Sequence, residues 1–175
     1  MKHTLVVIGV MVTLINGVAS AKIMSQNGIA KDSVTGLSWQ DTTEASSVEH
    51  DWEGAKGYCS ALTLEGEEGW RLPTIYELVT LVDSTKSGDP YLLKGITNSV
   101  SDHYWSASSH DNDTEYAFGV YFYTGNEGVY PKSATNYVRC VKGESLDIET
   151  LTTLHKKGKL KVALGVITNI IPEVK

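Results

Sequence analysis

The segment Gly69-Trp70-Arg71-Leu72-Pro73-Thr74-Ile75-Tyr76-Glu77-Leu78 predicts a rigid, capped entry into a helix. Pro73 fixes its own φ and keeps the residue before it extended. Thr74 is a suitable N-cap, and Glu77 stands three residues later, as a capping box requires. The apolar residues that follow recur at helical spacing, so we expect one helix face to enter a core through Ile75, Leu78, Val79 and Val82.

A first helix is predicted upstream, beginning at about Asp51, which is a suitable N-cap. Apolar residues recur there at intervals of three and four, which places Cys59 on the core side with Trp52, Ala55 and Leu62. Gly54 and Gly57 lie off that stripe, and each weakens the helix by about 1 kcal/mol relative to alanine. The helix therefore depends on its packing.

Strand patterns flank the two helices. Residues 30–40 predict a tight hairpin, because turn residues separate its two strands and the second strand contains Leu37-Ser38-Trp39. The alternation of side chains typical of strands resumes after His103. Further strands are expected at 104–108, 116–123 and 129–130, after a turn at 124–128, and the last strand, 136–141, carries Cys140. This order of a hairpin, two helices and an antiparallel sheet indicates an α+β fold.

The composition is that of a globular protein, with 41% hydrophobic and 21% charged residues in 175. A net charge of −6 argues against a nucleic-acid partner, whose phosphates require basic surfaces.

Residues 1–21 predict a signal peptide: a basic start, an apolar stretch from Leu5 to Val18 and an Ala19-Ser20-Ala21 cleavage site. We expect an exported chain, periplasmic, secreted or on the cell surface, and not an integral membrane protein after cleavage. The alternative is an uncleaved anchor helix.

Export changes how the two cysteines are interpreted. Cys59 and Cys140 form an even pair in the exported part, which favours a disulfide in an oxidising compartment. The closed loop would contribute roughly 4–5 kcal/mol at most by the loop-entropy relation. Two buried free thiols are the alternative.

Five motifs occur in a characteristic order: Thr35 to Gln40, Trp52 to Cys59, Trp70 to Leu78, Tyr104 to Ser108 and Tyr137 to Val141. Together they resemble the bacterial Lcl C-terminal domain family, named for a collagen-like adhesin, over about Gly28 to Lys142. The residues that carry the resemblance are Trp39, Trp52, Trp70, Arg71, Pro73, Thr74, Glu77, Trp105 and Arg139.

The resemblance implies a C-type lectin-like fold with two helices, a distorted antiparallel sheet and a disulfide from the first helix, at Cys59, to the last strand, at Cys140. It assigns residues 22–143 to the domain and leaves 144–175 as a C-terminal arm. It further implies an exported adhesion module that recognises a glycan or a surface protein without catalysis. The namesake is trimeric and is implicated in binding sulfated polysaccharide, but this chain lacks a collagen-like tract.

Candidate ligand-binding residues lie in the tyrosine-rich part of the predicted sheet. Exposed aromatic rings beside amides are suited to sugars or protein partners, which favours Tyr121, Tyr123, Asn126, Tyr130 and Asn136. A sulfated ligand would need Lys132, Arg139 and Lys142 to gather on one surface.

No cofactor is expected, and the tripeptides of calcium-dependent lectins are absent. Asp111, Asp113 and Glu115 carry oxygen ligands of the kind that Ca²⁺ prefers, although a solvated acidic loop explains them more simply. His103 and His110 flank one strand and, seven residues apart, would project from its opposite faces, so we do not expect them to share a metal.

The enzyme alternative is a formylglycine-generating enzyme, since those enzymes share the Arg-Leu-Pro-Thr-x-x-Glu stretch. They need additional cysteine chemistry, so we expect no enzyme activity here. A purely structural subunit of a surface complex is the other alternative.

Residues 147–155 favour a short helix, and Leu160 to Ile171 is apolar. We expect the core to fold without this arm, which would mediate self-association; alternatively, the arm completes the core.

Overall fold

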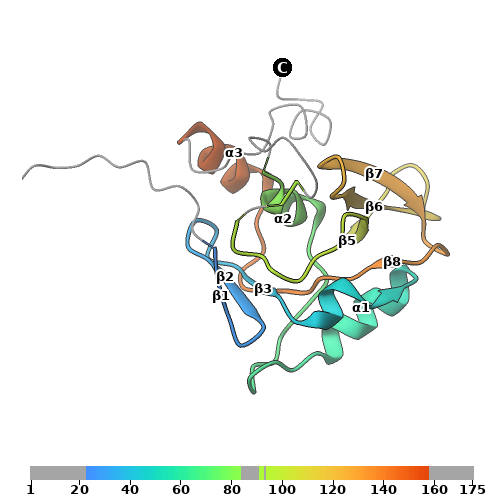
Figure 1. Cartoon of the computed structure of the whole chain (residues 1–175). Coiled ribbons are helices and arrows are strands. Elements are labelled where there is room, and N and C mark those ends of the chain that lie inside the picture. The colour runs from blue at the N-terminus through green and yellow to red at the C-terminus, as the bar shows by residue number, and fades with distance from the viewer. Residues whose placement is uncertain (1–22, 84–90, 93, 158–175) are drawn as a thin grey trace, which may run out of the picture.

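The computed structural model describes residues 23–83, 91–92 and 94–157. These form two sheets, three α-helices and two short 3₁₀ turns (Figure 1). The expected α+β class is confirmed, as are its antiparallel sheets and the disulfide between the first helix and the last-strand region. The predicted signal peptide, residues 1–21, lies outside the described residues.

The first sheet has four antiparallel strands in the order β1 (Ile23–Gln26), β2 (Ile29–Asp32), β3 (Ser38–Gln40) and β9 (Val141–Lys142). The second has the order β4 (Glu49–His50), β8 (Asn136–Tyr137), β5 (His103–Ser109), β6 (Tyr116–Tyr121) and β7 (Asn126–Pro131). Only β5 and β8 run parallel among these pairs, and a register irregularity between Trp105 and Ser109 distorts the β5–β6 ladder.

Two expected boundaries in the second half of the chain are corrected. The single strand predicted over 136–141 is divided into β8 and β9, because the chain leaves the five-stranded sheet at Tyr137 and joins the four-stranded sheet at Val141. The turn between β6 and β7 comes earlier than 124–128, since β7 already begins at Asn126. Gly125 supplies its positive φ of 73°.

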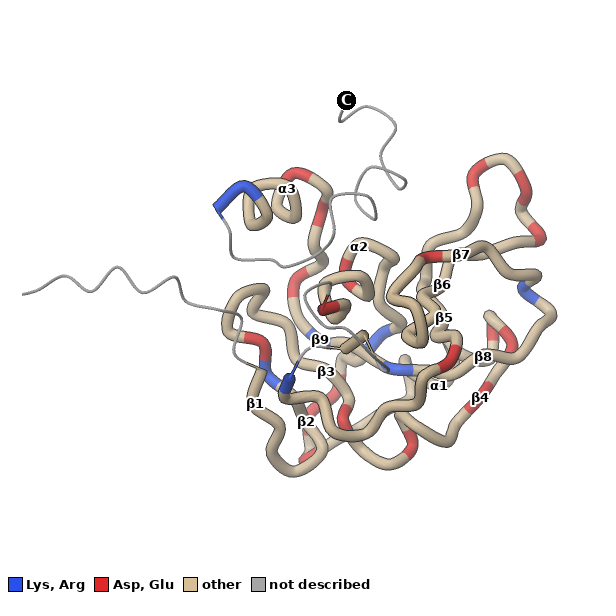
Figure 2. The backbone as a smooth tube through the Cα atoms, turned by 45° about the horizontal axis from the view of Figure 1, so that its top comes forward, with Lys and Arg blue, Asp and Glu red and all other residues tan. Residues whose placement is uncertain are grey.

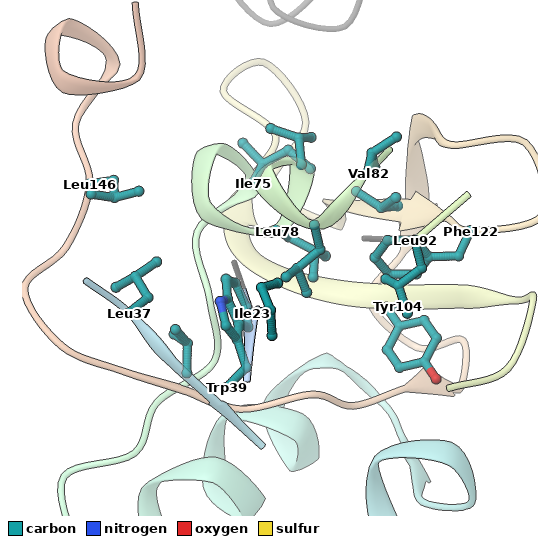
Figure 3. Close-up of a cluster of buried hydrophobic side chains, with 14 of the residues drawn as sticks. Ile23, Leu37, Trp39, Ile75, Leu78, Val82, Leu92, Tyr104, Phe122 and Leu146 are labelled. Carbon is teal, nitrogen blue, oxygen red and sulfur yellow. The ribbon is translucent and has the colours of Figure 1, made fainter. Parts of the chain in front are cut away.

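The capping box is present. The Thr74 hydroxyl accepts a hydrogen bond from the Glu77 amide, and the Glu77 carboxylate accepts one from the Thr74 amide. Helix α2 (Ile75–Leu78) is only one turn long and continues as a 3₁₀ turn, Val79–Leu81. It is buried on more than the one expected face, because it lies between strands of both sheets (Figure 3).

The first core forms around α2. Ile75, Leu78 and Val82 face Ile23, Leu37 and Trp39 of the N-terminal segment and Tyr104 and Phe122 from the five-stranded sheet (Figure 3). The second core lies on the other face of that sheet, beneath α1 (Trp52–Ala61), and includes Trp52, Trp70, Trp105, Cys59 and Cys140. Asp51 caps α1 as predicted, by accepting a hydrogen bond from the Gly54 amide. The disulfide joins Cys59 to Cys140 with an S–S distance of 2.03 Å.

The first part of the C-terminal arm belongs to the first core. Helix α3 (Ile148–Lys156) is capped by Asp147, and Leu146 and Leu151 are buried against the α2 cluster. The Leu146 amide also donates to the Glu77 carboxylate at 3.0 Å. This packing supports the alternative in which the arm completes the core. The apolar stretch Leu160 to Ile171 lies outside the described residues.

Candidate functional site

Strand register places four chemically suitable side chains in one row across the five-stranded sheet. His103 pairs with Tyr121, and Tyr121 pairs with Asn126. The parallel pairing of Tyr104 with Tyr137 sets Asn136 beside His103 on the neighbouring strand. Because side chains alternate along a strand, these residues share the face that α1 covers farther along, at Trp105.

The rings in and around this row contact one another. The imidazole of His103 stacks on Tyr121 with ring centroids 4.1 Å apart and planes within 6°. Tyr130 meets His103 edge-on at 4.8 Å, and Tyr123 lies 5.7 Å from Tyr121. These four residues, His103, Tyr121, Tyr123 and Tyr130, form what we call the aromatic platform. Tyr123 is 51% exposed, and the other three rings are partly accessible.

Two glycines form the floor beneath Tyr130. Gly119 and Gly128 are direct register partners on β6 and β7. A Cβ at Gly128 would lie 2.3 Å from the Tyr130 hydroxyl oxygen, and one at Gly119 would lie 3.2 Å from a carbon of its ring. The Tyr130 ring therefore rests on bare backbone and turns toward His103. Glycine inside a strand pattern is a signal for such an approach, although the sequence does not indicate which ring makes it.

The charges around the platform are negative. Asp102 precedes His103, and its Oδ1 lies 2.7 Å from the imidazole Nδ1. Burial raises the pKa of the Tyr130 hydroxyl, and the negative charges of Glu127 and Asp102 raise it further. Burial likewise raises the pKa of Tyr137 on β8, with Glu49 and again Asp102 acting in the same direction. The charge of Asp102 thus acts on both hydroxyls, although Tyr137 belongs to the other face of the sheet, like its register partner Tyr104.

Asn126 and Asn136 border the platform at opposite ends of the row. Asn126 is exposed at the start of the edge strand β7. The Nδ2 atom of Asn136 is buried and has no hydrogen-bond partner among the described residues. All five residues that the sequence singled out for ligand binding therefore lie in this one region. Sequence reasoning missed His103 and Asp102 as members of it.

Lys132, Arg139 and Lys142, the cations that a sulfated ligand would need together, lie apart. Arg139 is fully buried, donates to the backbone carbonyls of Gln40 and Asn98, and lies 3.6 Å from Asp41 Oδ1. Burial lowers the pKa of Arg139, which Tyr104 and Asp41 oppose. Lys142 pairs with Glu67 at 3.0 Å on the other sheet, and Lys132 lies 4.1 Å from the Trp52 ring centroid. The condition for a sulfated ligand, that these three residues gather on one surface, is therefore not met, because Arg139 is a core residue.

Comparison with known families gives a match that covers most of the chain. Residues 28–142 match the family described as the Lcl C-terminal domain. The chain belongs to this family. The match includes α1, α2, the five-stranded sheet and both cysteines, whereas β1 and α3 lie outside it. A comparison with curated proteins found no match.

The acidic loop of this Lcl C-terminal domain connects β5 to β6 and projects from the end of the sheet (Figure 2). It contains Asp111, Asp113 and Glu115. Asp113 uses its Oδ1 to accept the Glu115 amide, and its own amide donates to His110. Within the described residues, no group of three or more His, Cys, Asp or Glu side chains is placed to hold a metal ion.

The Arg71–Thr74 segment lines a second surface of the Lcl C-terminal domain, an open groove of about 610 Å³ beside α1. Arg71 holds the Glu77 carboxylate with two hydrogen bonds of 2.6 and 2.7 Å, and Thr74 serves as the helix cap. Both side chains are thus engaged in structure.

Across the described ranges, no helix is long and apolar enough to cross a membrane.

Proposed function

We propose that the protein is an exported, non-catalytic binding module that holds a glycan against the aromatic platform. The observation that carries this proposal is the continuous contact of four partly exposed rings: His103, Tyr121 and Tyr130 on one sheet face, and Tyr123 in the adjoining turn. Aromatic side chains with a polar tip suit a ligand that has both an apolar face and hydroxyl groups.

The polar neighbours of the platform complement the rings. Each carboxamide of Asn126 and Asn136 can both donate and accept hydrogen bonds, as sugar hydroxyls require. They stand at opposite ends of the row, with His103 and Tyr121 between them.

Export is supported by the disulfide and by the family. Both cysteines of the chain are joined in the disulfide, a state that persists in oxidising compartments and is rare in the cytosol. Membership of the Lcl C-terminal domain family is consistent with that location. The predicted signal peptide at residues 1–21 would direct it.

The absence of catalysis is part of the proposal. The enzyme alternative needs reactive thiols, and the bonded cysteines supply none. Arg71, Thr74 and Glu77, which the chain shares with formylglycine-generating enzymes, satisfy one another within the capping box.

A glycan array tests the proposal, with the full chain applied with and without EDTA. We expect binding to at least one glycan that EDTA does not change. Tyr123→Ala should weaken it at least about fivefold, because one exposed stacked ring is removed. Tyr116→Ala is the matched control, since Tyr116 is an exposed tyrosine of β6 that points to the face opposite Tyr121, whereas Tyr123 lies in the turn after β6 and contacts Tyr121. Binding to no glycan, or equal losses in both variants, would refute the proposal.

A further inference from the structure

The aromatic platform combines rings with carboxylates, and this combination favours one class of sugar. The carboxylates that act on the hydroxyl of the platform residue Tyr130 are those of Glu127 and Asp102, and both are negative. Ring faces beside carboxylates attract cations, because the face of an aromatic ring is itself electron-rich. An anionic sugar placed there would instead be repelled.

Asp102 is the carboxylate best placed for such a contact. Its side chain is 53% exposed, it precedes the platform residue His103, and its Oδ1 lies 2.7 Å from the imidazole Nδ1. Glu127 lies on the edge strand β7, but its register partner is Val120, a residue of the opposite face. Glu127 therefore contributes to the local potential without pointing across the rings.

The positive charges that would suit a sulfated sugar are engaged elsewhere. Arg139 is buried beside Asp41, Lys142 is paired with Glu67, and Lys132 donates to Ser109 while lying over Trp52. The described residues therefore give the platform the electrostatics of a site for cations.

We propose that the platform recognises a glycan that carries free amino groups, such as a chain of glucosamine units, with one ring on Tyr121 and Tyr123 and its ammonium group toward Asp102. This inference rests on the proposed function of glycan binding and adds the class of sugar. An open sheet face suits a flat pyranose ring, and the exposed carboxylate at its border suits the ammonium group. N-acetylated and sulfated sugars lack this positive charge and should bind less well.

Isothermal titration at about pH 6 tests the inference, because carboxylates are ionised there while sugar amines retain positive charge. The probes are oligomers of glucosamine, of N-acetylglucosamine and of a heparin-type sulfated sugar, all of equal length. We expect the glucosamine oligomer to bind about fivefold more tightly than its N-acetylated counterpart, the scale of one exposed ionic and cation–π contact. Added salt should reduce this preference.

Asp102→Asn should abolish the preference, so that the glucosamine oligomer binds no more tightly than its N-acetylated counterpart. The asparagine retains the oxygen that accepts the His103 amide, so the start of β5 is preserved. Asp111→Asn is the matched control: it removes an identical charge beyond the far end of β5, about 20 Å along the strand. This variant should keep the preference.

The outcomes separate the two proposals. Equal binding of the two oligomers, with loss of both in Tyr123→Ala, would overturn the amino-sugar inference and leave glycan binding intact. Tighter binding of the sulfated oligomer, or an unchanged preference in Asp102→Asn, would also overturn the inference. If none of the oligomers binds, or only a lysine-rich peptide does, both the inference and the proposed function fail.

Discussion

Glu77→Gln is expected to destabilise the protein strongly, because the Glu77 carboxylate joins three segments of the chain. Its side chain is fully buried and accepts four hydrogen bonds. Oε2 accepts from Arg71 at 2.6 Å and from the Thr74 amide at 2.8 Å; Oε1 accepts from Arg71 at 2.7 Å and from the Leu146 amide at 3.0 Å. A carboxamide keeps one oxygen and turns an NH₂ group toward two of these donors.

The expected loss is about 3 kcal/mol, the lower end of the range for breaking a buried ion pair, because Arg71 is 32% exposed and water can solvate it in part. Urea unfolding measures the change in free energy. Glu53→Gln is the matched control, since Glu53 pairs with Lys56 at the surface, and it should cost less than about 0.5 kcal/mol. Amide exchange at Leu146 should accelerate only in Glu77→Gln.

The effect should also depend on pH. Burial works to raise the pKa of Glu77, but hydrogen bonds from Arg71 and from the Leu146 and Thr74 amides outweigh it, and the pKa falls below the ordinary value of 4.5. Because the pKa of Glu77 is lower in the folded state, its ionised carboxylate stabilises the protein fully above about pH 4.5. This stabilisation is lost as the pH falls through the folded-state pKa. The difference between wild type and Glu77→Gln should therefore shrink in acid. A loss below about 1 kcal/mol at neutral pH, or one equal to that of Glu53→Gln, would refute this reasoning.

Three further predictions concern the core and the platform. Replacing both Cys59 and Cys140 with alanine should cost about 2–5 kcal/mol in urea unfolding, because the disulfide closes an 81-residue separation; an unchanged midpoint would contradict its structural role. Truncation after Lys142 should lower the melting temperature by more than about 10 °C, since Leu146 and Leu151 leave the first core; a melt equal to that of the full chain would mean that α3 is dispensable. Gly128→Ala should displace the Tyr130 ring and weaken glycan binding in titration, because the new Cβ would lie 2.3 Å from the ring's hydroxyl oxygen, whereas Gly57→Ala, whose Cβ meets no atom within 4 Å, should leave binding unchanged.

Local features of this fold were accessible from the sequence. The capping box needs only Thr74 and Glu77, three residues apart, and the N-cap of α1 needs only Asp51 beside an apolar repeat. The shared face of Tyr121, Asn126 and Tyr130 also follows from simple alternation once the two strands pair. Each of these predictions depends on neighbours in sequence or on one hairpin.

Features that depend on distant partners were not accessible. Arg139 was counted among possible surface cations, yet it is neutralised by Asp41, 98 positions earlier, and fully buried. The segment that leads into α3 is held by the hydrogen bond from the Leu146 amide to Glu77, 69 residues earlier. The residues adjacent in sequence to Arg139 and Leu146 do not indicate whether these two side chains are buried or exposed to solvent.

The disulfide determines how mechanical force would pass through the molecule. The N-terminal β1 and the C-terminal β9 are the two edge strands of the four-stranded sheet, and the chain then continues into α3. Tension applied to the chain on either side would run from the N-terminal strands to Cys59, cross the sulfur bridge and leave through Cys140. Strands β5 to β8, with the rings they carry, lie within the bypassed loop. The aromatic platform would therefore bear no pulling load while the bridge is intact, and the four-stranded sheet would yield first.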